Sequence, residues 1–288
     1  MFNALLGLIS FNNERFLILV KEVEEIGIIS NSPILLIKDV YFFSIKYNLD
    51  YSFFSEETLS FIKGAKEILK QGMYFSEDYD LTNTLQRMAM NTIKGKALFY
   101  SANEEFLWNK KMAEEFKKAK VNMSWLVPLI KGYVDIIDEI INNEPLKVVL
   151  ISRGGNNRVG IFECTYGIDE NGNVANMIET EQIIYYKQET YSFNQIRGSI
   201  PVFWTNQGSY INIAQLPEYS IIAFTKHFDH LISTYNRVLI LNLLTNIKYS
   251  EIKLSRTFEI NLETYEKNSD SVVKYYKLDI DDIKVSFC

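Results

Sequence analysis

The stretch ILLIKDVYFFSI at residues 34–45 decides the fold of the first part of the chain. A short run this rich in Ile, Val, Phe and Tyr is typical of a β-strand rather than a helix. Similar short apolar runs precede it, separated by polar breaks: LLGLIS at 5–10, FLILV at 16–20 and EIGII at 25–29. The sequence therefore predicts an antiparallel meander of strands at the start of the chain.

Downstream of the meander the apolar period changes to that of an amphipathic helix. Ser55 is a candidate N-cap, Glu56 and Glu57 suit the first turn, and Gly72 ends the pattern. The apolar residues at helical spacing are Leu59, Ile62, Ala65 and Leu69. Further helices are predicted after Asp80, over 103–120 and over 134–141.

We place a lobe boundary near residue 130, which gives an N-terminal lobe of residues 1–130 and a second lobe of residues 131–288. After the predicted helix at 134–141, the second lobe is predicted to contain a strand at 147–152 and a long hairpin at 158–186 with its turn at 169–173. Strands and helices then alternate as in α/β proteins: strand 191–198, helix 221–235, strand 237–244, helix 250–263 and strand 271–279.

Composition narrows the class of protein. The chain has 288 residues, of which 47% are hydrophobic and 23% charged, so it has ample material for a core and is not a disordered segment. A net charge of −6 argues against a general nucleic-acid binder, and no nucleic-acid partner is expected. No apolar run is long enough to span a bilayer, so no transmembrane segment is predicted.

Few local patterns indicate chemistry. Glu179 and Glu181 stand two apart on a predicted strand, so their carboxylates share one face, and such pairs are more often solvated or salt-bridged than catalytic. His227 and His230 have metal-ligand spacing but no accompanying ligand, so capping or packing is the favoured interpretation and no metal is expected. The turn SRGGNNR at 152–158 presents two arginines that suit a phosphate, although a plain surface turn is the commoner reading.

Several motifs in order carry a family resemblance. They are YFSEDYDLTNTLQR at 74–87, FLWN at 106–109, WLVPLIKG at 125–132, SRGGNNRVG at 152–160, GNVANMIETEQII at 172–184, QIRGSIPVFW at 195–204 and KHFDHLISTYN at 226–236. In order and spacing the chain resembles the Sac domain of phosphoinositide phosphatases over nearly its whole length. The patterns ANxxETEQ and RGSIPxFW are the most specific of them.

The resemblance implies an α+β or α/β protein, with an N-terminal β-meander lobe that carries helices and then a catalytic lobe of the cysteine-phosphatase kind. Such enzymes dephosphorylate inositol lipids without a cofactor, through a Cys-x₅-Arg loop whose thiolate attacks phosphorus. Six residues after Cys164 stands Glu170, and Cys288 is the last residue, so no such loop occurs. We therefore expect an incomplete catalytic lobe, truncated before the loop, and a chain that is inactive by itself.

The resemblance also supplies candidate binding residues, because some of the family's basic positions remain. Candidate contacts to a lipid headgroup are Arg153, Arg158, Arg197 and Lys226, and candidate hydrogen-bonding residues are Asn176 and Gln182. Neighbouring basic residues typical of the family are replaced, by Gly154, by Phe162 and by Thr165 and Tyr166, which predicts weak headgroup binding.

Two functions stay open on the sequence. The chain is either part of a phosphoinositide phosphatase or a non-catalytic Sac-type module, a pseudophosphatase that binds membrane lipid or a protein partner. The expected partners are a phosphoinositide headgroup, the cytosolic surface of a membrane and a possible protein that completes the catalytic lobe. By the resemblance, the expected location is cytoplasmic and peripheral at endomembranes of the endoplasmic reticulum and Golgi.

Overall fold

The structure, a computed structural model, divides the chain into two compact units. The first unit comprises Met1–Asn156 and Ile178–Ile196, and the second comprises Asn157–Met177 and Arg197–Cys288. The residues described are 2–46, 53–90, 97–159, 165–207, 210–213, 217–245, 247–268 and 273–278. Within them the protein is a mixed α/β structure with one large antiparallel sheet and several helices.

The first unit is built on an eight-stranded sheet in the order β1-β2-β3-β4-β5-β6-β8-β9. The strands are β1 (Ala4–Phe11), β2 (Glu14–Ile29), β3 (Ser32–Ser44), β4 (Met73–Phe75), β5 (Ile130–Ile141), β6 (Glu144–Gly154), β8 (Ile178–Tyr186) and β9 (Glu189–Arg197). The predicted meander is confirmed, since β1, β2 and β3 pair in sequence and antiparallel. Alternate residues such as Phe16, Ile18 and Val20 point into the core and are completely buried.

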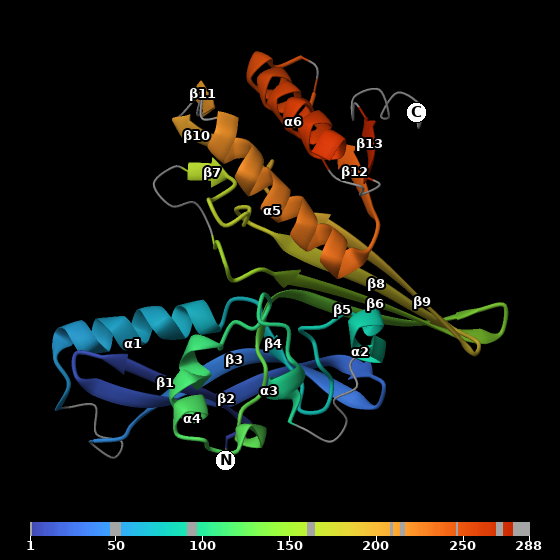
Figure 1. The fold of residues 1–288 in the computed structure, drawn as a ribbon. Coiled ribbons are helices and arrows are strands. Elements are labelled where there is room, and N and C mark those ends of the chain that lie inside the picture. Colours follow the sequence, from blue (N-terminus) through green and yellow to red (C-terminus); the bar gives the residue numbers. More distant parts are fainter. Residues whose placement is uncertain are drawn as a thin grey trace. The chain divides into compact units, whose positions relative to one another are not determined.

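The helix α1 (Glu56–Leu69) is the predicted amphipathic helix, and it lies along the sheet of β1–β3 (Figure 1). Ser55 is its N-cap, because the Ser55 hydroxyl accepts a hydrogen bond from the Thr58 amide at 3.2 Å. Ile62 and Leu69 are buried against the sheet. Gly72 follows with a φ of 64°, the left-handed conformation that lets the chain turn into β4.

The prediction of a continuous helix over 103–120 is wrong. Within this segment the structure has only the short 3₁₀ helix η2 (Lys111–Ala113) and the short helix α4 (Glu114–Lys118), while α3 (Leu98–Ser101) precedes it and the 3₁₀ helix η3 (Met123–Trp125) follows it. Its polar groups bond to backbone carbonyls distant in sequence instead, since the Trp108 amide donates to the Leu129 carbonyl at 2.8 Å and the Asn109 side chain donates to the Leu6 carbonyl at 2.8 Å. Tertiary hydrogen bonds therefore interrupt the helix.

Two further predictions are corrected by the sheet. Residues 134–141 belong to strand β5, not to a helix, because β5 pairs with β6 from Gly132↔Arg153 to Ile141↔Glu144. Residues 158–186 do not form one hairpin, because β8 pairs with β6 while β7 (Thr165–Gly167) pairs with β10 (Phe203–Gln207). The predicted turn at 169–173 is present, and the predicted helix after Asp80 begins as α2 (Leu85–Met90).

Among its described residues, the second unit has two smaller sheets and two long helices (Figure 1). β7, β10 and β11 (Tyr210–Ile213) form one sheet, and β12 (Val238–Asn242) pairs in parallel with β13 (Val273–Lys277). The helices α5 (Pro217–Tyr235) and α6 (Tyr249–Asn268) match the predicted helices and share a core of aromatic side chains. These buried aromatic residues are Phe224, Phe228, Phe258 and Tyr265.

Candidate functional site

Arg153 lies at the end of β6 and is completely buried in the first unit. Its Nη1 donates to Glu179 at 2.6 Å, and its Nη2 donates to Glu181 at 2.8 Å. Its Nε donates to the carbonyl of Leu81 at 2.8 Å, and Nη2 also reaches the carbonyl of Asn83 at 3.1 Å. Each guanidinium nitrogen is therefore engaged by an acceptor of the protein itself.

The two glutamates share one face of β8, as the spacing of two predicts, and both are completely buried. Arg153 stands opposite Glu179 in the β6–β8 register, which brings the charges together. Arg87 adds a second cation, with hydrogen bonds of 2.8 and 2.6 Å to the Glu179 carboxylate. Glu181 in turn accepts from the Leu85 amide at 2.9 Å and is the partner of Arg153. The salt-bridged interpretation of the pair is confirmed, and these residues are not solvated.

Because a buried charge is stable only when paired and hydrogen-bonded, this cluster fixes the segment that carries its partners. Leu81 and Asn83 supply carbonyls, and Leu85 and Arg87 supply donors, so residues 81–87 are held against β6 and β8. Sequence reasoning missed the role of Arg87. The residue stands at the end of the quoted motif YFSEDYDLTNTLQR, and its partner is distant in sequence, so no local pattern identifies the pairing.

The candidate residues of the second unit surround one loop, residues 168–177. Arg158 donates to the Gly167 carbonyl at 2.7 Å, immediately before this loop, and its own carbonyl accepts from the Asn176 amide at 3.4 Å. Partial burial lowers the pKa of the Arg158 guanidinium from its ordinary value, while the charge of Asp169 acts in the opposite direction. Arg158 therefore holds both ends of the loop.

The middle of the loop is a tight turn that contacts α5. The Asp169 carboxylate accepts hydrogen bonds from the amides of Asn171 and Asn173 at 2.9 and 2.8 Å. Lys226 donates from its ammonium to the Glu170 carbonyl at 2.9 Å, and Nδ1 of His227 lies 3.0 Å from the Gly172 carbonyl. His227 is buried, in agreement with a packing role.

The remaining candidates differ in exposure. Arg197 and Asn176 are exposed. The loop contacts the segment that follows Arg197, because the Ser199 amide donates to the Ala175 carbonyl at 3.0 Å. Gln182 is exposed on β8 and points away from Glu181, on the opposite face of the strand. Four of the six candidates, Arg158, Asn176, Arg197 and Lys226, therefore belong to the second unit, while Arg153 and Gln182 belong to the first.

The remaining expectations concern the two cysteines, a metal site and a membrane span. Cys164 and Cys288 both lie outside the described residues. Within the described part of the chain, no group of three or more His, Cys, Asp or Glu side chains is arranged to hold a metal ion. No helix among the described residues has the length and apolar character needed to cross a membrane.

Comparison with known proteins identifies the family. The SacI homology domain matches residues 3–283. The phosphatidylinositol-3-phosphatase SAC1 of Saccharomyces cerevisiae is 32% identical over 270 residues, which cover 89% of this chain and 42% of that protein. The phosphatidylinositide phosphatase SAC2 of Homo sapiens is 32% identical over 216 residues, which cover 62% of this chain and 19% of that protein. The phosphatidylinositol-3-phosphatase SAC1-B of Danio rerio is 36% identical over 194 residues, which cover 65% of this chain and 33% of that protein.

The chain thus spans less than half the length of these curated relatives. The motifs quoted above fall within the matched region, and the resemblance stated from them is confirmed. The match covers almost every residue, so the chain belongs to the SacI homology domain family.

Proposed function

We propose that this chain binds phosphoinositide headgroups through the second unit and, taken alone, does not hydrolyse them. The observation that carries the proposal is the arrangement around the loop of residues 168–177, to which the basic residues Arg158 and Lys226 are both hydrogen-bonded. In this proposal Arg158 positions the loop, while Lys226, Arg197 and the side-chain amide of Asn176 contact the phosphates. Arg153 has a structural role, because its donors are already engaged.

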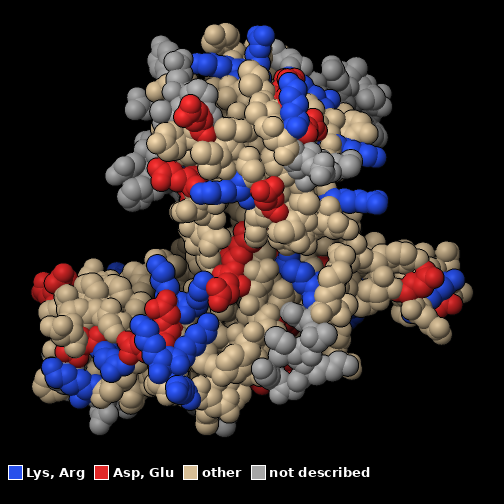
Figure 2. Space-filling model, viewed as in Figure 1, with Lys and Arg blue, Asp and Glu red and all other residues tan. Residues whose placement is uncertain are grey.

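We expect the second unit to bind headgroups weakly. Lys226 and Arg197 are exposed, and exposed charges are screened over about 8 Å at physiological ionic strength. On the described part of the face drawn in Figure 2, basic and acidic side chains are interspersed, so attraction to a membrane rests on a few local cations. We infer a peripheral, reversible association with the cytosolic face of an endomembrane.

The proposed lack of hydrolysis is supported by the sequence of the chain. A cysteine phosphatase needs a thiolate and an Arg six residues later to hold the phosphate, and no Cys-x₅-Arg occurs in the 288 residues. The test is phosphate release from short-chain phosphatidylinositol phosphates, measured with malachite green on the purified chain. No turnover is expected. Turnover that the Cys164→Ser substitution removes would overturn this part of the proposal.

The binding part has its own test, flotation with phosphatidylcholine vesicles that contain phosphatidylinositol 4-phosphate. We expect retention that falls as salt rises and that the pair Arg197→Ala/Lys226→Ala removes. The matched control is Lys253→Ala/Arg256→Ala, which removes the same charges from exposed positions on α6. An equal loss of vesicle retention in the two double variants would show that only the net charge of the protein matters, and it would contradict a headgroup site at the loop.

A further inference from the structure

An apolar pocket of about 230 Å³ lies within the first unit, and none of the residues proposed to bind headgroups lines it. Its floor is the inner face of the strands, with Ile18 and Phe42, and one wall is α1, with Phe61 and Ala65. The other wall is the segment before α4, with Met112. The close approach of this segment depends on Gly7, because a Cβ there would lie 2.5 Å from the Met112 carbonyl oxygen.

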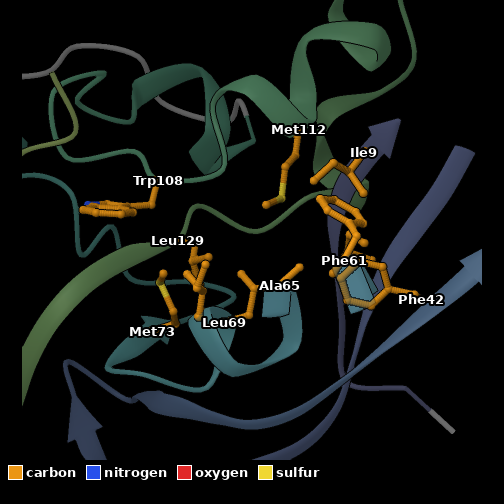
Figure 3. Close-up of a pocket in the computed structure, with 11 residues that line it drawn as sticks. Ile9, Phe42, Phe61, Ala65, Leu69, Met73, Trp108, Met112 and Leu129 are labelled. Atoms are coloured by element: carbon orange, nitrogen blue, oxygen red, sulfur yellow. The ribbon is translucent and has the colours of Figure 1, made fainter. Parts of the chain in front are cut away.

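The pocket is elongated and has two unlike ends (Figure 3). Trp108 lies at one end, and Phe61 lies at the other with Ile9 beside it. Phe61 stacks on Phe11 with their ring centroids 4.1 Å apart, which backs that end with an aromatic pair. Ile68 lines the pocket and is 55% exposed, so the pocket has an open side along α1.

A cation stands at the Trp108 end. Lys131 is opposite Met73 in the β4–β5 register, and directly opposed residues project from the same face of a sheet. The Lys131 ammonium lies 4.9 Å from the centre of the Trp108 ring, while the Trp108 Nε1 donates to the Gly154 carbonyl at 2.7 Å and fixes the ring. No carboxylate of the described residues lies within ion-pair distance of Lys131.

We propose that this pocket binds the alkyl chain of an anionic amphiphile, with the negative head directed toward Lys131. A wholly apolar lining favours hydrocarbon over water, and a cavity of about 150 Å³ already accommodates benzene. By that scale the pocket takes a chain of about eight to ten carbon atoms. An apolar pocket with a cation at one end is complementary to a hydrocarbon chain that ends in a carboxylate or phosphate, and it is not complementary to a neutral polar metabolite.

Isothermal titration calorimetry of the 288-residue chain with hexanoate, octanoate and decanoate tests the dependence of affinity on alkyl-chain length. Each added methylene is expected to tighten the dissociation constant about fourfold until the pocket is full. The absence of binding by decanoate, or affinities that do not change with chain length, would overturn the proposal.

Pocket filling supplies the second test. Ala65→Leu places three additional carbon atoms in the pocket and is expected to weaken decanoate binding at least tenfold. Ala65→Met serves as a second filling variant if Ala65→Leu folds poorly. The matched control is Gly64→Ala, the neighbouring position on α1, where an added Cβ meets no atom within 4 Å. Decanoate binding to both filling variants with the affinity of the parent would place the ligand elsewhere and refute the site.

The charge requirement is tested by Lys131→Met, which keeps the length of the side chain. Decanoate is expected to bind about threefold to fivefold more weakly to this variant, since a partly exposed cation contributes modestly, whereas decanol is unaffected. Lys63→Met, on the outer side of α1, is the control and should change neither ligand. Equal weakening of decanoate and decanol would contradict a role for the charge.

A free alkanoate and the tail of a membrane lipid share this chemistry, and vesicles distinguish them. Vesicles of phosphatidylcholine with phosphatidic acid are floated in the presence and absence of decanoate. Retention that decanoate and Ala65→Leu both remove identifies a lipid tail as the occupant. Decanoate binding with no effect of Ala65→Leu on vesicle retention identifies a free alkanoate, and the pocket assignment stands in either case.

Discussion

The guanidinium of Arg153 lies between two carboxylates at a place from which water is excluded. Glu179 also forms an ion pair with Arg87, and Glu181 forms its ion pair with Arg153. The same type of residue that would bind a phosphate on the surface here stabilises the sheet. The surroundings, rather than the residue type, therefore decide its role.

Replacing Arg153 with Met should cost about 3–5 kcal/mol of unfolding free energy, because removing one partner leaves a buried charge unpaired. Adding Glu181→Gln should recover about 1–2 kcal/mol, since the unpaired carboxylate is then neutral. Urea unfolding followed by circular dichroism measures both. Lys147→Met on the same strand is the control and should cost less than about 1 kcal/mol. An equal loss in the two Met variants would show that Arg153 is no more important than a surface cation.

Tyr79 offers a prediction about pH. Its side chain is 7% exposed, and its hydroxyl makes no hydrogen bond to any described residue. Burial raises the pKa of Tyr79 well above its usual value near 10, with smaller contributions from Tyr185 and Glu181. The unfolded chain loses this proton first, so the associated stability is complete below about pH 10 and is lost as the pH rises further.

The Tyr79→Phe variant should therefore lose less stability than the parent between pH 9 and pH 11. At pH 7 it should be neutral or more stable by up to about 1 kcal/mol, because an unpaired buried hydroxyl is removed. Urea unfolding at each pH gives the difference, and exposed Tyr219→Phe is the control. A Tyr79→Phe protein with the same alkaline decline as the parent would mean that the burial of this hydroxyl has no role in it.

At the scale of elements, the sequence predicts secondary structure correctly where interactions between neighbouring residues determine it. The helix α1 follows from Ser55 as its N-cap and from apolar residues at helical spacing, and the shared face of Glu179 and Glu181 follows from the strand period of two. The sequence does not predict it correctly where pairing between strands determines the structure. Ile137, Ile140 and Ile141 have helical spacing, yet β5 is a strand because its backbone pairs with β6 along its length.

In the candidate site, too, the sequence identifies residues but not their distant partners. The basic residues were identified by resemblance, but the engagement of Arg153 by Glu179 joins positions 26 apart in sequence. The interruption of the predicted helix at 103–120 likewise depends on the bonds of Asn109 to the Leu6 carbonyl, 103 residues away. Short-range periodicity carries no information on such contacts.

The helix α1 also gives a stability prediction. Gly64 lies in its interior, and an added Cβ meets no atom within 4 Å, so Gly64→Ala should stabilise the protein by about 1 kcal/mol. Ser55→Ala should destabilise it by about 1 kcal/mol through loss of the N-cap. Thermal and urea unfolding measure both, and the double variant should lie near the parent. A destabilised Gly64→Ala protein would show that the helix has no free space at this position.

At the scale of the whole molecule, the first unit is discontinuous in sequence, since β8 and β9 return to its sheet after residues 157–177. A fragment of residues 1–196 contains every strand of that sheet, while 1–156 lacks β8 and leaves Arg153 without its carboxylates. We therefore propose that 1–196, rather than the 1–130 lobe suggested by sequence, is the smallest stable fragment.

Size-exclusion chromatography and urea unfolding of fragments 1–130, 1–156 and 1–196 test this. The longest should be monomeric and unfold cooperatively, and 1–156 should aggregate through the exposed edge of β6. The 1–130 fragment should be less stable than 1–196, because it lacks the β5–β6 and β6–β8 pairs. A 1–156 fragment as stable as 1–196 would show that β8 and β9 contribute nothing to the unit.

The separation of Arg153 from Glu179 also sets an order of events during synthesis on the ribosome. The chain grows by about 5–20 residues per second, so the 26 residues between them take about one to five seconds. During this interval the cation has emerged without its counter-charges and β6 has a free edge. Until β8 emerges, the free edge of β6 can hydrogen-bond only to water. The pairing of β6 with β8 is therefore the step that covers this edge and brings the counter-charges to Arg153.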